Sequence, residues 1–521
     1  MNAFSASPLH AGAPRAASAM LAALLALSGC AVGPDFEQPA APAAERYSAA
    51  ATPAATAGDD RTPAQRLHAG MDIPAQWWTL FRSPELDRLV REALAHSPTL
   101  EQARARLLQA QEEFRAESGA RTLPSVDANL SGARQKVDPS AYGVPVTQPP
   151  APFTLYNASI DVSYTLDLFG GERRAVEGLL AQVDYRRHEL QAARMTLAAN
   201  VVTAAIRQAG LQARLDATQA QLDAQAHQLD IVRQRHQAGG AAALEVRRQE
   251  SLLAQTRATL PALEQDIERT RHQLAVYLGR LPAQADWPPL SLQALQLPLD
   301  VPLGVPSQLT RQRPDILAAE ALWHRAAADV GVATANLYPR FTLTGSFGSQ
   351  RTRAGDVADG VNVWSLALGL TQPLFHGGEL RARRRAAEAA YQAAAAAYRD
   401  TVLQGLQQVA DALSAVQADA DTLQARAEAE RQAEAAYRIT AQQYQAGGVS
   451  QLALLDAQRE QLRTRAERIQ AQADRHADTA ALLQALGGGW WNEQEGVSSL
   501  HPTQSPPACH GCLPATASPA R

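Results

Sequence analysis

The sequence is poor in cysteine, with only three, at positions 30, 509 and 512. Cys509 and Cys512 form a single C-x-x-C pair, and the chain has no second pair that would complete a zinc site. The pair lies in a Pro- and Ser-rich tail, residues 488–521, whose composition is typical of a disordered segment. We therefore interpret it as an incidental disulfide or as two residues without a role.

An excess of positive charge is also missing, since the formal net charge is -4. This balance argues against a nucleic-acid surface. The histidines are scattered over polar positions, and the sequence contains no G-x-S-x-G, P-loop or H-E-x-x-H motif. We expect no enzymatic activity and no metal site. The densest basic group is interpreted as the solvated start of a helix: Arg381, Arg383, Arg384 and Arg385.

Apolar runs long enough for a transmembrane helix are absent. The apolar run that follows Arg15 is too short to span a bilayer and is typical of a signal-peptide core. It ends in Leu-Ser-Gly-Cys, which resembles a bacterial lipoprotein box and implies a signal peptide over residues 1–29. The same resemblance implies an S-diacylglycerol and an N-acyl group on Cys30 and, because Ala31 follows, the outer membrane. Residues 30–66, rich in Ala and Pro, are expected to form a flexible tether.

Two long helices dominate what the sequence does contain, at residues 172–236 and 379–444. Neither has an internal proline, each is bounded by Gly-Gly pairs, and each carries apolar residues seven apart. At about 1.5 Å per residue each helix is roughly 100 Å long, so it needs neighbouring helices along its length. Return helices of about half that length are expected at 244–278 and 452–486. On periodicity alone, a solvated coiled-coil dimer is the less favoured alternative.

Four segments alternate apolar and polar residues with the period of a β-strand. They are expected at about 124–136, 155–168, 341–350 and 362–372. Each has one apolar and one polar face over about the 9 to 11 residues that a tilted membrane strand needs.

The whole pattern occurs twice, at a spacing of 208 to 216 residues. We therefore predict two tandem repeats, 67–280 and 307–487, separated by a linker at 281–306. The fold class is mainly α with membrane β-strands, four per chain. Because an open sheet edge in lipid leaves backbone groups unpaired, several chains must combine. Two chains give eight strands and no pore, whereas three give a twelve-stranded β-barrel above a long α-helical barrel.

Several motifs make the chain resemble a known family: the lipobox, Trp77-Trp78, Arg313-Pro314-Asp315-Ile316 and Leu454-Leu455-Asp456-Ala457-Gln458. They closely resemble the TolC-like outer-membrane efflux factors, in the NodT-type lipoprotein subgroup of resistance-nodulation-division (RND) systems. The resemblance implies a homotrimeric conduit through the outer membrane and periplasm. It also implies an inner-membrane RND pump that loads the substrate and a periplasmic adaptor, or membrane fusion protein, that contacts the helical tips.

The candidate functional site is formed by the two tips, where each long helix turns into its return helix. By motif match, Leu452 and Asp456 correspond to the family's periplasmic constriction, an apolar plug and an acidic ring. Leu244 and Arg248 are their first-repeat equivalents, and an Arg248–Asp456 pair between helices or subunits is a candidate latch, although both charges are also explained as solvated. The residues expected to contact the adaptor are Gly239, Gly240, Gly447, Gly448, Val449 and Ser450.

The function predicted is a passive outer-membrane duct that conducts drugs or other small molecules from a tripartite efflux pump. Type I protein secretion and metal efflux use similar ducts and remain alternatives. The transported substrate cannot be read from this chain, because its selection lies mainly in the pump.

Overall fold

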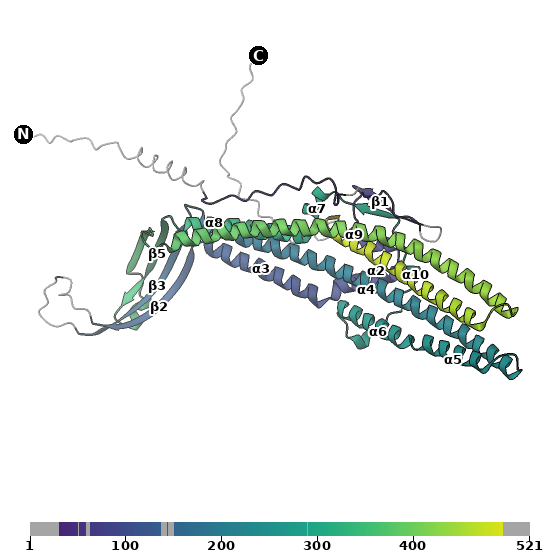
Figure 1. The fold of residues 1–521 in the computed structure, drawn as a ribbon. Helices are drawn as coiled ribbons and strands as arrows, with labels where there is room; N and C mark the ends of the chain where they lie inside the picture. The colour runs from purple at the N-terminus through teal and green to yellow at the C-terminus, as the bar shows by residue number, and fades with distance from the viewer. Residues whose placement is uncertain are drawn as a thin grey trace, which may run out of the picture.

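A computed structural model describes residues 31–49, 52–58, 63–136, 143, 151–288 and 290–492. The expected signal peptide, Cys30 and the cysteines at 509 and 512 lie outside these residues. The molecule is elongated, with a β-sheet at one end and two helical hairpins that end together at the other (Figure 1). In the part of the chain that is described, no helix combines the length and apolar character needed to cross a membrane.

The sheet consists of four antiparallel strands in the order β2-β3-β5-β6. One apolar row crosses it in register, because Ala128 lies opposite Ile160, Ile160 opposite Phe347, and Phe347 opposite Trp364. Strands β2 and β6 are its two edges. The expected pattern of four strands per chain is confirmed, with these bounds: β2 Ser125–Gln135, β3 Phe153–Leu166, β5 Arg340–Arg351 and β6 Val363–Thr371.

Two helices of 67 residues each run from the sheet to the tips, α4 (Gly171–Gln237) and α9 (Glu379–Gln445). Each begins after a glycine in the left-handed conformation, Gly170 (φ 77°) and Gly378 (φ 85°). These two N-cap glycines are 208 residues apart. The repeated sequence motif instead aligns Gly378 with Gly171, one residue after the N-cap of α4. Shorter helices lie alongside the halves of the long helices that are nearer the sheet. Helix α3 (Pro98–Thr122) packs against α4, and α8 (Pro314–Ala335) packs between α4 and α9.

The two return helices differ. The second is continuous, α10 (Gln451–Ala485), but the expectation of one helix over 244–278 is wrong. The first is split into α5 (Ala243–Arg257) and α6 (Leu260–Tyr277). Pro261 is the cause, because its ring nitrogen has no hydrogen to donate to the carbonyl four residues earlier, that of Arg257, where α5 ends.

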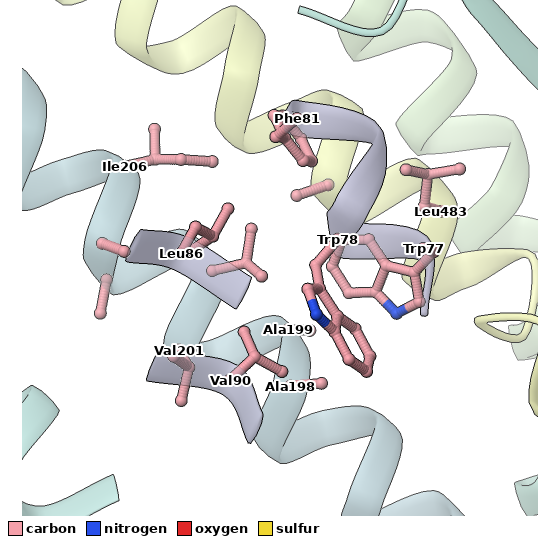
Figure 2. Close-up of a cluster of buried hydrophobic side chains, with 14 of the residues drawn as sticks. Trp77, Trp78, Phe81, Leu86, Val90, Ala198, Ala199, Val201, Ile206 and Leu483 are labelled. Atoms are coloured by element: carbon pink, nitrogen blue, oxygen red, sulfur yellow. The ribbon is translucent and has the colours of Figure 1, made fainter. Parts of the chain in front are cut away.

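The main core lies at mid-length, where η1 (Trp77–Phe81) and α2 (Pro84–His96) pack against α4 and α10. Figure 2 shows Trp77, Trp78 and Phe81 beside Leu86 and Val90 of α2, with small α4 side chains facing them. The Ser83 Oγ caps α2 by accepting a hydrogen bond from the Leu86 backbone N–H at 3.3 Å. The alanines of α4 leave the space that the two indoles fill.

The expectation of a flexible tether over residues 30–66 is wrong for the described residues between 31 and 58, which pack against the helices. Asp35 forms an ion pair with the buried Arg174 of α4. The Phe36 ring stacks on His324 of α8 with centroids 4.5 Å apart, and the Tyr47 hydroxyl donates to the Gly304 carbonyl at 2.8 Å. We call residues 31–49 and 52–58 the strap, because they run along both repeats.

The linker and tail are also more ordered than expected. Within 281–306, β4 (Asp300–Leu303) pairs in parallel with β1 (Arg66–Ala69), a two-stranded sheet too short to be seen in the sequence pattern. The tail is not disordered at residues 488–492, since the Trp490 Nε1 donates to the Gln312 carbonyl at 2.7 Å. The remaining short helices are η3 (Pro282–Gln284), η4 (Leu292–Ala294), α7 (Pro306–Gln312), η5 (Ala354–Ala358) and η6 (Trp490–Asn492).

Candidate functional site at the helical tips

The same turn closes both hairpins. Gly239 (φ 78°) and Gly447 (φ 76°) follow the last turn of α4 and α9 in the left-handed conformation that favours glycine. The next residues, Gly240 and Gly448, donate their N–H to the carbonyls of Arg235 and Gln443 at 2.7 and 2.8 Å. This pattern satisfies carbonyls that the helix ends leave free, so each tip is a compact, defined turn.

The two tips begin their return helices differently. The Ser450 Oγ accepts a hydrogen bond from the Ala453 N–H at 3.4 Å and caps α10, and Val449 beside it is half-buried. The equivalent residue at the start of α5 is Ala242, which has no side chain to accept such a bond. Instead, the His236 Nδ1 lies 2.7 Å from the Ala241 carbonyl and ties the loop to α4.

A set of side chains that the sequence patterns did not point to joins the two tips. The Gln451 Nε2 donates to the Glu245 backbone carbonyl at 2.9 Å, and the Tyr444 hydroxyl lies 3.4 Å from the Glu245 carboxylate. The Arg235 guanidinium lies over the Tyr444 ring, 5.3 Å from its centroid. Burial and the Glu245 charge raise the pKa of Tyr444, so its hydroxyl stays protonated at neutral pH.

The proposed gate residues lie on the surface of the single chain near these tips. Leu244 is 59% exposed and Leu452 is 46% exposed, although both are large and apolar. Asp456 is exposed and lies 3.6 Å from Arg459 of its own helix. Among the described residues, no ion pair joins Arg248 to Asp456 within one chain. The version of the latch within a chain is therefore not seen, and a contact between subunits stays a prediction.

Glu245, Tyr444 and Gln451 were missed for a physical reason. They act between hairpins that are about 200 residues apart in the chain, and no local pattern reports such a contact. The sequence contains one weak signal of these contacts. Tyr444 and His236 are equivalent under a shift of 208 residues, so both long helices end near an aromatic ring that carries a polar atom.

Comparisons with known proteins agree with this architecture. The model of the outer membrane efflux protein family matches residues 89–280 and 305–488. The pyoverdine export outer membrane protein OpmQ of Pseudomonas aeruginosa is 32% identical, over 81% of this chain and 89% of its own length. The outer membrane protein OprJ of the same organism is 32% identical, over 91% of this chain and 95% of its own length.

A solved structure extends the likeness to three dimensions. The outer-membrane channel OprN is 32% identical, covers 88% of this chain and 100% of its own, and superposes with a TM-score of 0.78. The fold, the predicted location and the efflux function are thereby confirmed. This chain belongs to the outer membrane efflux protein family and is the outer-membrane channel component of an efflux system.

Proposed function

We propose that three copies of this chain form one continuous conduit, a twelve-stranded barrel above a tunnel of six long helices. The observation that carries this proposal is the four-stranded sheet with both edges unpaired among the described residues. Lipid cannot satisfy the backbone groups of such edges, at a cost of several kcal/mol for each group, so the sheet closes only with further copies.

The proposal includes a covalent lipid, S-diacylglycerol and N-acyl, on Cys30. Its support is the position of the first described residues. The Val32 N–H donates to the Phe169 carbonyl at 3.0 Å, at the junction between β3 and α4. Val32 is two positions after Cys30, so a lipid on Cys30 is attached within two residues of the junction that ends the membrane strands.

The partners in this proposal are a periplasmic adaptor at the tips and an inner-membrane RND pump. Exposed apolar side chains near the tips, Leu244 and Leu452 among them, provide a surface for that contact. By its name, OpmQ exports pyoverdine. We propose that the cargo of this chain is likewise small organic molecules rather than proteins or metal ions.

The closed state in this proposal is a ring at the tips. Leu452 from three copies forms an apolar plug, and Asp456, with its side chain 62% exposed, forms an acidic ring one turn away. Leu244 and Arg248 of the first hairpin lie against this ring, and Arg248 pairs with Asp456 of a neighbouring subunit. Acidic rings favour cations in a pore.

Photo-crosslinking in cells tests the partners. A photoreactive amino acid replaces Ser450 at the tip, and a control carries it at the exposed Ser291 at mid-length. We expect mass spectrometry to identify an adaptor of an RND system from position 450 and not from 291. A secretion adaptor at position 450 would instead make the cargo a protein.

Conductance in planar bilayers tests the ring. Asp456→Ala should raise the closed-state leak and weaken cation selectivity, whereas Glu460→Ala, one turn further along the same helix, should change both less. Unchanged leak and selectivity in Asp456→Ala would contradict the gate.

A further inference from the structure

Two unpartnered surfaces of the chain lie at opposite edges of the same sheet. Leu130 of β2 is 80% exposed, and Leu374, just beyond β6, is 92% exposed. Below the sheet, the first turns of α9 are exposed on the β6 side, and α3 contacts α4 on only one of its faces. These surfaces belong to different repeats.

Within the chain, one contact between the repeats is already complete. Strand β3 of the first repeat pairs with β5 of the second, and α4 packs on α8 below them. The open edges are the same elements with the repeats exchanged, since β6 is equivalent to β3 and β2 is equivalent to β5. The internal contact is therefore a template for the contact between two copies.

The structure gives the residue equivalence needed to use this template. Strands β2 and β5 both start directly after a proline, at Ser125 and Arg340, a shift of 215. The N-cap glycines of α4 and α9 are 208 apart. The hairpins agree with the sum of the two shifts, because Val126 pairs with Val162, and the shifted residues, Phe341 and Leu370, pair with each other.

We propose that β6 pairs antiparallel with β2 of a second copy in the register that this template defines. The template pair Val162–Gly345 becomes Leu370 opposite Leu130 of the partner subunit. The template pair Leu166–Phe341 becomes Leu374 opposite Val126 of the partner subunit. The proposal rests on the trimer of the proposed function and specifies how its subunits join.

Side-chain chemistry agrees with this register. Each of these pairs sets apolar residues that are exposed in the single chain against each other. At the far end of the strands, the template pair Tyr156–Arg351 becomes Trp364 opposite Lys136 of the partner subunit, again an aromatic ring and a cation. Such cross-strand pairs stabilise a sheet.

The helices below continue the same contact. In the template, the His324 Nε2 of α8 lies 2.8 Å from the Glu177 carboxylate of α4. The shift of 208 carries Glu177 to Arg385 of α9, and the shift of 215 carries His324 back to Gln109 of α3. The template contact therefore becomes Arg385 beside Gln109 of the partner subunit. The Gln109 amide donates to Glu113 of its own helix at 2.8 Å, so a carboxylate lies within one turn of the guanidinium. At least Arg385 of the basic cluster is thus an interface residue rather than a solvated one.

Disulfide trapping tests the register. The experiment uses the full chain with Cys509→Ser and Cys512→Ser, and adds Ala367→Cys and Ala133→Cys, which the register sets opposite each other. Two control pairs shift the register by two residues, Ala367→Cys with Ser131→Cys and Ala367→Cys with Gln135→Cys. Membranes are treated with a mild oxidant and separated on denaturing gels without reductant.

We expect covalent links between chains to be at least about fivefold more abundant for the aligned pair, because a shifted pair lies roughly 7–8 Å apart, beyond ordinary disulfide reach. Ser163→Cys with Thr344→Cys, a pair in the template itself, should link within one chain and shows that the sheet has folded. Stronger linking of a shifted pair overturns the register and leaves the trimer standing. Unlinked chains that also have the native mass of a monomer overturn the trimer.

Discussion

Single residues control the turns at the tips through their backbone angles. Gly239 and Gly447 have φ values near 77°, whereas Gly240 and Gly448 lie outside the left-handed region. A side chain at the first glycine of each pair is strained although space is open around it. The sequence shows two equivalent glycines at each tip, but only one is required by its conformation.

We predict that Gly239→Ala with Gly447→Ala destabilises the protein by about 1 kcal/mol per site, because in the left-handed conformation a Cβ lies too close to the carbonyl oxygen of its own backbone. The matched control is Gly240→Ala with Gly448→Ala. Thermal unfolding followed by circular dichroism should show a lower midpoint only for the first variant. Equal midpoints in the two variants would contradict the assignment.

A carboxylate in the middle of the molecule also depends on its surroundings. Burial and the neighbouring Asp478, with Asp474, raise the pKa of Asp419 to about 7, although Arg475 opposes the shift. The folded protein holds this proton more strongly than the unfolded chain. Stability from this group is therefore greatest below about pH 4 and decreases as pH rises toward 7.

We predict that Asp419→Asn raises the thermal midpoint at pH 8 by about 2 °C or more and changes it less at pH 5, because the amide carries no charge. Asp421→Asn, an exposed neighbour on the same helix, is the control and should show no such dependence on pH. A rise of the same size at both pH values would show that the carboxyl is not protonated in the folded state.

At the scale of elements, the strap connects the two repeats. Asp35 reaches the buried Arg174 of α4, which also pairs with Glu177 at 2.8 Å, and Glu177 contacts His324 of α8 at 2.8 Å. This series of polar contacts crosses from the strap through the first repeat to the second. The strap therefore stabilises the contact that is also the template for assembly.

We predict that Asp35→Ala loosens the strap and costs about 1 kcal/mol, because Arg174 loses one of its two carboxylate partners while remaining buried. Limited proteolysis should then cut the N-terminal segment several-fold faster than in the parent protein. Glu37→Ala, an exposed strap residue, should be cut at the parent rate. Equal rates for both variants would mean that the ion pair does not hold the strap.

At the scale of the whole molecule, the proposed interface sets charged residues of two copies side by side. The register of the proposed interface brings Arg385 toward Glu113 of the partner subunit. Arg383, by contrast, pairs with Glu379 of its own helix at 2.6 Å and has no assigned role between subunits.

We predict that Arg385→Glu or Glu113→Arg alone lowers the yield of trimer on native gels, since like charges then face each other across the interface. The double variant should recover most of the yield because the pair is restored with exchanged signs. Arg383→Glu is the control for a general effect of charge and should assemble normally. Failure of the double variant to recover would argue against this pair.

Much of the fold follows from local patterns, because each is set by residues close in sequence. Periods of 7 and of 2 predicted the long helices and the strands, and the glycine pairs predicted the tips. The split of the first return helix had its own local signal in Pro261, which the apolar periodicity around it masked. In the candidate site, the positions of Gly239 and Gly447 were predictable, but the contacts of Glu245 with Tyr444 and Gln451 were not.

The sequence by itself thus determined the duplication, the four strands per chain, the long helices and the family, since these depend on short-range periodicity and on motifs. Only the tertiary structure decided that the strap packs on Arg174, that Trp490 anchors the start of the tail, and that the two tips are tied together. The physical reason is the same in each case. These contacts join residues more than 100 positions apart, and their free energy depends on burial and geometry that exist only after the helices have packed.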